Sequence, residues 1–275
     1  MPAQVRPVLT LLAALAAAAT IVPLGQVLYT LLGAVPAFAA SSAAVQETIF
    51  TLLVFGAMLA VAATGLTIEH GWSGLVGRNI AALVGTGLAI GFGGLVLTAA
   101  ITAVAIPVAR HAEVGPAVVS IIAGTLLVLF QAGAEEVYFR GWLQPVLVRA
   151  WGRLAGVLVT AAAFAILHLS GGERSLTTLL NLVLGGLLFG LLAQRSGGIL
   201  MSTAAHFGWN WAEIIVLGLA PNPGIGSFGA LVDLDITGSA LWGGSAEGLN
   251  ASLAMTFVLT ALLLPAIAWR GDRTA

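Results

Sequence analysis

Residues 116–147 of the chain read PAVVSIIAGTLLVLFQAGAEEVYFRGWLQPVL. This stretch is long and apolar enough for a membrane-spanning helix, which needs about 20 mostly apolar residues. It nevertheless contains two adjacent glutamates and an arginine, Glu135, Glu136 and Arg140. An ionisable group in hydrocarbon costs on the order of 2.5–3.5 kcal/mol on insertion scales, so such groups tend to be functional. The stretch therefore predicts a membrane helix that carries a functional site.

The composition of the whole chain supports a membrane environment. Hydrophobic residues make up 59% of the sequence and charged residues only 8%, whereas an average soluble domain has roughly 25% charged residues. The net charge of -1 gives no indication of nucleic-acid binding, and the absence of cysteine excludes disulfides and thiolate chemistry. We therefore expect an all-α, multi-pass protein of the cell membrane, with the lipid bilayer as much of its solvent.

The same length criterion, applied outward from residues 116–147, predicts a bundle of about eight transmembrane helices. We divide the chain into N-terminal helices (1–115, about three), a core that holds the polar residues (116–219), a Gly-rich acidic loop (220–249) and the last helix with a short tail (250–275). The segments are expected to form one compact domain, with the first helix retained rather than cleaved as a signal peptide. The predicted helices are 8–33, 45–67, 80–106, 116–147, 153–169, 176–194, 199–219 and 250–269.

The arginine positions predict the orientation. Eight spans place both termini on one side of the membrane, and the positive-inside rule favours the side with more basic residues. We therefore expect both termini in the cytoplasm and the loop 220–249 outside the cell. This choice leaves only Arg110 and Arg174 outside and makes seven arginines cytoplasmic: Arg6, Arg78, Arg149, Arg153, Arg195, Arg270 and Arg273.

Helical spacing separates the two glutamates. Glu136 and Arg140 are four residues apart, so they share a helix face and can form an ion pair. Glu135 is rotated by about 100° from Glu136, given 3.6 residues per turn, and lacks that arginine. Glu135 is therefore the better candidate for a general base, and Glu136 for a structural ion-pair partner.

Four further polar residues lie in predicted helices. His168 ends the fifth helix, and Phe164, one turn earlier, can pack beneath its ring. His206 and Asn210 are four residues apart in the seventh helix, where they could provide two donors for an oxyanion or a metal ligand and its neighbour. Glu213, about one turn further on, is expected to be structural or interfacial.

The depths of these residues can be compared. A turn near Gly152 should join the fourth and fifth helices, with Glu135 17 residues before it and His168 16 residues after it. At 1.5 Å per residue both stand about 24–26 Å from the turn, so they are level. His206 lies about 8 residues past the Gly197-Gly198 turn, or about 12 Å from it, so it becomes level with them only if the Gly152 hairpin protrudes further by two turns.

A small-x-x-x-small pattern is also present. Gly186 and Gly190 lie four residues apart in the sixth predicted helix. Glycines at this spacing let two helix backbones approach closely. We expect them to serve close packing of the bundle.

Three motifs in this order resemble the type II CAAX prenyl endopeptidases and their bacterial relatives, the CPBP family of intramembrane proteases. Residues 135–140 fit Glu-Glu-x-x-x-Arg, residues 164–168 fit Phe-x-x-x-His, and residues 206–210 fit His-x-x-x-(Asn/Asp/Ser). The resemblance covers roughly residues 116–215. The other segments match only in hydropathy.

The resemblance implies eight membrane helices around a conical cavity and hydrolysis of a peptide bond by an activated water. It makes Glu135 the base and gives His168 the role of helping to hold the water. His206 and Asn210 would stabilise the oxyanion, while Glu136, Arg140 and Phe164 would organise the site. Residues 116–219 would then be the catalytic core.

Cofactor and substrate are less constrained. We expect no cofactor, although zinc is an alternative that Glu135, His168 and His206 would hold; no His-Glu-x-x-His motif is present. The expected substrate is a peptide or a membrane protein, of unknown identity. The sequence predicts no nucleic-acid partner and gives no oligomeric state.

Two other function classes fit the same residues. One is a non-enzymatic membrane protein, such as an immunity or scaffold protein that binds a peptide or partner in the same cavity. The other is a transporter that uses the glutamates and histidines as a proton relay. The three complete motifs favour the protease, and the sequence shows no two related halves such as many transporters have.

Overall fold

The computed structural model describes residues 5–69, 71–72, 74–110, 117–171, 175–219 and 226–269. Most of these residues are helical. The helices are α1 (Val5–Leu32), α2 (Pro36–Ala39), α3 (Ala43–Glu69), α4 (Ile80–Ala105), α5 (Val118–Glu136), α6 (Gln144–Leu167), α7 (Leu176–Ser196), α8 (Leu200–Trp211) and α9 (Leu253–Ala268). The π-helical segments η1 (Val137–Leu143) and η3 (Ala212–Val216) continue α5 and α8, and the 3-10 segments are η2 (His168–Gly171), η4 (Gly226–Phe228), η5 (Ala240–Trp242) and η6 (Gly248–Ala251).

Each of the eight predicted helices has a counterpart in this structure, which confirms the all-α membrane fold. Among the described residues, five helical segments are long and apolar enough to cross a membrane. One of them, Val118–Leu167, is 50 residues long and contains both the fourth and the fifth predicted helices. α9 is apolar but shorter, with 16 residues.

Gly152 makes the predicted turn between the fourth and the fifth predicted helices. Its backbone angles are φ 82° and ψ 166°, a conformation that glycine adopts easily and other residues rarely do. The chain reverses there, since a Cβ built on Gly156 would lie 2.6 Å from the backbone nitrogen of Val148. The helix α6 therefore consists of two antiparallel arms, and the hairpin predicted near Gly152 is confirmed.

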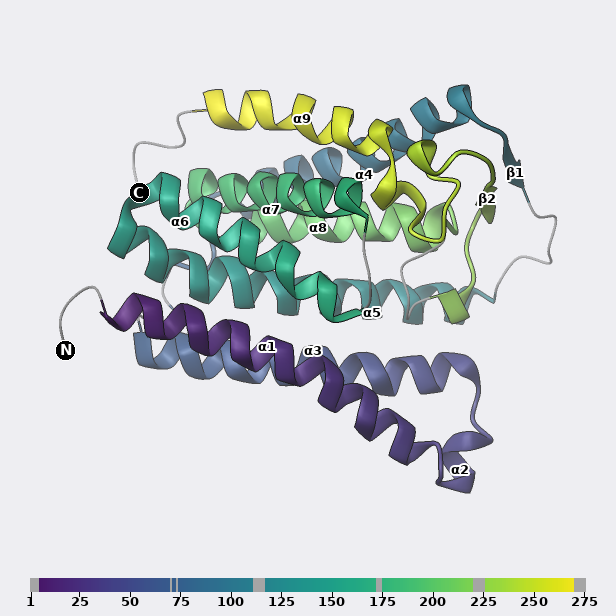
Figure 1. Cartoon of the computed structure of the whole chain (residues 1–275), viewed down its shortest axis with the longest axis horizontal. Coiled ribbons are helices and arrows are strands. Elements are labelled where there is room, and N and C mark those ends of the chain that lie inside the picture. Colours follow the sequence, from purple (N-terminus) through teal and green to yellow (C-terminus); the bar gives the residue numbers. More distant parts are fainter. Residues whose placement is uncertain are drawn as a thin grey trace.

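The helices form layers, with the polar motifs in the central one (Figure 1). α1 and α3 pack together on one side, and α3 contacts α5 and η1. α4 packs along α8 and α9 on the other side. The helices that carry most of the three motifs, α5, α6 and α8, thus lie between helices on both sides; His168, the last residue of the second motif, follows α6 in η2.

The distribution of side chains is inverted relative to a water-soluble protein. Ionisable side chains such as Glu136 and Glu213 are almost fully buried, whereas large aliphatic side chains cover the outside. A bilayer can solvate such an apolar exterior, while it penalises lipid-exposed charge. The most exposed aliphatic side chains include Val104, Val118, Val119, Leu154 and Leu176.

A small antiparallel sheet was not predicted. β1 (Val108–Arg110) pairs with β2 (Leu234–Ile236), and Ala109 lies opposite Asp235. The described part of the loop 220–249 is therefore tied to the segment after α4. Three-residue strands leave almost no alternating pattern in a sequence, so periodicity could not identify them.

The ends of several helices bring arginines together at one end of the bundle. Arg6 forms an ion pair with Glu69, at the end of α3, and Arg195 donates to the Ile267 carbonyl, near the end of α9. Arg110 lies on β1, at the opposite end (Figure 1). The start of α1 and the end of α9 thus lie at the same end of the bundle. Arg174, Arg270 and Arg273 lie outside the described residues.

Candidate active site

The first motif spans a change of helix type. Glu135 and Glu136 are the last two residues of α5, and Arg140 belongs to the π-helical segment η1. Short π-helical segments within α-helices frequently occur at functional sites. The sequence does not predict this π-helical segment, because its residues fit an ordinary helix equally well.

The ion pair predicted from helical spacing is present. Arg140 Nη1 lies 2.8 Å from Glu136 Oε1, and both side chains are fully buried. Arg140 Nη2 donates a second hydrogen bond, of 3.1 Å, to the Gly186 carbonyl. The guanidinium also lies over the Phe164 ring, 4.7 Å from its centroid. Arg140 therefore joins the first motif to the second motif and to α7.

The two glycines of α7 allow this connection. Arg140 and Gln144, four residues apart, donate to the carbonyls of Gly186 and Gly190, which are also four apart. A Cβ on Gly186 would lie 3.0 Å from the Ala161 Cα, which is closer than side chains normally pack. The close packing expected from the small-x-x-x-small pattern is thus confirmed, and it places two α7 carbonyls within reach of the first motif.

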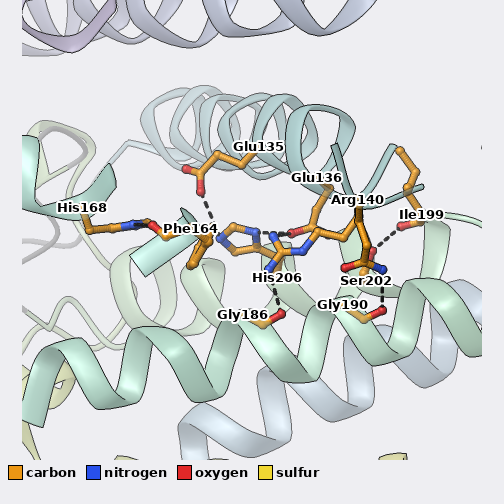
Figure 2. A network of polar contacts seen from close by, with 11 residues as sticks. Glu135, Glu136, Arg140, Phe164, His168, Gly186, Gly190, Ile199, Ser202 and His206 are labelled. Atoms are coloured by element: carbon orange, nitrogen blue, oxygen red, sulfur yellow. Dashed lines mark hydrogen bonds and ion pairs between the residues drawn. The ribbon is translucent and has the colours of Figure 1, made fainter. Parts of the chain in front are cut away.

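His206 lies between the two glutamates (Figure 2). Its Nδ1 is 3.0 Å from Glu136 Oε1, where an N–H donates to the carboxylate, and its Nε2 is 4.0 Å from Glu135 Oε2. The Phe189 ring stacks on the imidazole with a centroid distance of 4.8 Å. Three contacts thus orient one ring, and Glu136 connects His206 to Arg140.

His168 is oriented by the other residue of its motif. The His168 Nδ1 donates to the Phe164 carbonyl at 2.8 Å, and the two rings lie 4.6 Å apart. The packing of Phe164 beneath His168 that we expected is therefore present. Because Nδ1 is engaged in this way, Nε2 is the nitrogen through which His168 can act on a bound molecule.

A cavity of about 100 Å³ brings the candidate residues together. Glu135, His168, His206 and Asn210 all line it, as does Phe164. Its remaining lining residues are Gln131, Asn181, Leu182, Gly185, Phe189, Trp209, Glu213, Asn250, Met255 and Leu259.

The contact between His206 and Glu135 resolves the question of depth. His206 is level with Glu135, although it is only nine residues from Gly197 while Glu135 is 17 residues from Gly152. At 1.5 Å per residue, the Gly152 hairpin therefore reaches about 12 Å further along the bundle than the turn at Gly197.

Some features of the site were not predicted. Glu136 was expected only to pair with Arg140, yet it also holds His206. Glu213 was expected to be structural or interfacial, and it lies buried in the cavity wall. Asn181 lines the cavity and donates to the carbonyls of Asn250 and Ser252, which fixes the start of α9. Only the contacts between helices distinguish these residues from other polar residues.

The geometry also bears on the zinc alternative. Within the described part of the chain, no three or more His, Cys, Asp or Glu side chains lie close enough together to hold a metal ion. The set of Glu135, His168 and His206 lines the cavity but does not form such a group. The residues as placed do not fit a zinc site.

Residues 116–212 match the protein family described as type II CAAX prenyl endopeptidase Rce1-like. The matched segment contains all three motifs, from Glu135 to Asn210, so the resemblance to the CPBP family is confirmed over these residues. A search of curated proteins and a search of solved structures each found no match for the chain.

Proposed function

We propose that this membrane protein, whose residues 116–212 are Rce1-like, is an intramembrane endopeptidase. It would hydrolyse a peptide bond of a membrane-associated or peptide substrate. The observation that carries the proposal is the convergence of Glu135, His168, His206 and Asn210 on one cavity. These residues come from three separate helical segments, and they provide a base and several hydrogen-bonding groups at one place.

Glu135 has the position of a general base. Unlike Glu136, it is not held by an ion pair with Arg140, and it faces the cavity. In the proposed reaction Glu135 takes a proton from a water molecule, and the resulting hydroxide attacks the carbonyl carbon of the scissile bond. His168 helps to hold the water through Nε2. Glu135 then transfers the proton to the leaving amine, so that one carboxyl group and one amine are formed and the base is regenerated.

The tetrahedral intermediate needs partners for its oxyanion. Asn210 can donate its carboxamide N–H, and protonated His206 can donate Nε2–H. Because Nδ1–H of His206 donates to Glu136, the Glu136–Arg140 pair fixes the direction of Nε2. The buried pair thus acts on the reaction by positioning His206, not by contacting the substrate.

The proposal uses water activated by Glu135, without a metal ion. Full activity after treatment with a zinc chelator would agree with it. Loss of activity in the chelator, with recovery on addition of zinc, would contradict this part of the mechanism.

The protein reconstituted in liposomes provides the test of activity. A library of fluorescence-quenched peptides would identify a cleaved sequence, and the rate would then be compared among variants. General acid–base catalysis contributes typically 10²–10⁴-fold, so Glu135→Gln and His168→Ala should each lower kcat by at least about 100-fold. Glu69→Gln is a matched control, because Glu69 pairs with Arg6 at the end of the bundle.

Folding of each variant is checked by its elution in detergent and its thermal unfolding. Full activity in a folded Glu135→Gln or His168→Ala variant would overturn the assignment. Protection of cells against a bacteriocin that persists in Glu135→Gln would instead favour an immunity protein that only binds its partner.

We also propose that both termini face the cytoplasm. The arginine-rich end of the bundle, with Arg6 and Arg195, supports this orientation under the positive-inside rule. Since the chain has no cysteine, a single introduced cysteine can report its side of the membrane. Asp235→Cys should react with an impermeant maleimide in whole cells, and Arg78→Cys should react only after permeabilisation. The reverse pattern would contradict the proposal.

A further inference from the structure

Glu213 is a buried carboxyl that the proposed reaction does not use. It lies in η3, three residues after Asn210 and four after Trp209, and it lines the same cavity as both. Only 1% of the surface of Glu213 is exposed. Its Oε1 atom has no hydrogen-bond partner among the described residues.

An unpartnered buried carboxyl is costly. Moving a polar group out of water costs free energy unless another group replaces its hydrogen bonds with water. A buried charge costs more and requires a partner. Glu47, another buried carboxyl, also has an Oε1 atom without a partner, but its Oε2 accepts a hydrogen bond from the Ser227 backbone N–H. Arg140 pairs with Glu136 and does not line the cavity that Glu213 lines.

The cavity wall carries two carboxyl groups and no permanently positive group. Among the described residues that line it, Glu135 and Glu213 are acidic, and none is an arginine or a lysine. Phe164 and Phe189 also line the cavity, but Phe164 already carries the Arg140 guanidinium and Phe189 stacks on His206. The carboxyl groups therefore decide which charge a ligand of this cavity should have.

We propose that Glu213 is a specificity-determining residue that binds a cationic group of the peptide substrate close to the scissile bond. This proposal rests on the proposed peptidase function and names its substrate class. The cationic group is an arginine or lysine side chain, or a free N-terminal ammonium. On binding it supplies the charge partner that Glu213 lacks.

Matched peptides test the proposal. Starting from a sequence that the reconstituted protein cleaves, each position beside the scissile bond is replaced in turn by arginine, glutamine or glutamate, with both ends of the peptide blocked. A fourth peptide has a free N-terminal amine and only neutral side chains. Removing one partner of a buried charge pair costs a factor of at least about 10 in binding, so kcat/KM for the best arginine peptide should exceed that of its glutamine counterpart by about tenfold. Preference for the free amine alone would identify an N-terminal ammonium as the ligand.

Glu213→Gln should abolish this preference, bringing the arginine-to-glutamine ratio close to one and improving the glutamate peptide. Glu47→Gln is a matched control, because Glu47 is a similarly buried carboxyl that lines a different pocket; it should keep the preference. Glu213→Asp retains the charge with a shorter reach and should keep a reduced preference. It replaces the glutamine variant if that variant does not fold.

Binding to the Glu135→Gln variant separates this proposal from the peptidase function. Fluorescence anisotropy should show tighter binding of the arginine peptide, and the difference should vanish when Glu213→Gln is added. If the wild type cleaves none of the library peptides but basic members of that library show this binding preference, the peptidase function is wrong and the cation site stands. If cleavage depends on Glu135 but arginine, glutamine and glutamate peptides react equally in the wild type and in Glu213→Gln, the cation site is wrong and the peptidase function stands.

Discussion

Replacement of Arg140 by methionine tests how the buried ion pair supports the site. Methionine keeps an unbranched, apolar side chain but removes the charge. Glu136 would then be left fully buried without its 2.8 Å partner, and the Gly186 carbonyl would lose its hydrogen bond. Breaking a buried pair by removing one partner is destabilising by about 3–5 kcal/mol. We expect Arg140→Met to lower the free energy of unfolding by at least about 3 kcal/mol.

The assay is a double-mutant cycle on the unfolding free energy, measured by denaturant titration in mixed micelles. Glu136→Gln removes the charge on the other side, and the double variant leaves no uncompensated buried charge at this position. The double variant should therefore be more stable than the sum of the two single changes predicts, by about 1–3 kcal/mol. Arg149→Met, at an exposed position, is the control and should change stability by less than about 0.5 kcal/mol.

Two results would refute this reasoning. One is a cost below about 1 kcal/mol for Arg140→Met, the range expected for a solvent-exposed pair. The other is additivity of the two single changes to within about 0.5 kcal/mol, which is the behaviour of independent sites.

Two further predictions concern helix packing and the oxyanion. Gly91→Ala should destabilise the protein and lower its activity, because a Cβ there would collide with the Ala205 carbonyl and push α8, with the adjacent His206, away from α4. Gly93→Ala is the matched control, since nothing lies within 4 Å of a Cβ at that position. Thermal unfolding measures the stability of each variant, and the cleavage rate measures its activity. Equal stability and activity of the two variants would contradict the packing account. Asn210→Ala should lower kcat by about 10²–10³-fold, as removal of an oxyanion donor does, with little change in KM; a change in KM alone would show that Asn210 only binds substrate.

Local patterns predicted much of the fold. Hydropathy and length identified the eight helical segments, since each run of apolar residues is continuous in the sequence. Gly152 was identified as the hairpin turn because it lies between two long apolar runs. The Glu136–Arg140 pair followed from a spacing of four residues, which helix geometry fixes whatever surrounds it.

Contacts between distant segments were not predictable in the same way. Glu136 and His206 are 70 residues apart, and no periodicity states which face of α8 meets α5. The same holds for the Gly186 carbonyl that accepts from Arg140, and for Phe189, which stacks on His206. Glu213 illustrates the difference most clearly, because its burial in the cavity depends on how η3 packs against its neighbours.

The π-helical segment η1 is a further case. Its sequence has no proline and continues the apolar run of α5, so an α-helix was the natural prediction. Tertiary contacts decide the helix type here, since Tyr138 donates to the Ala14 carbonyl of α1 and Arg140 donates to α7. Local preference does not contain that information.

The measurement that tests the central claim most directly is a comparison of protein N-termini in membranes from cells with the wild-type protein and cells with Glu135→Gln. We predict new N-termini, produced by cleavage within or beside membrane segments, that occur with the wild type and are absent with the variant at equal expression. Identical sets of N-termini in the two membranes, or fragments that persist in Glu135→Gln, would contradict the account of Glu135 as the base of an intramembrane endopeptidase.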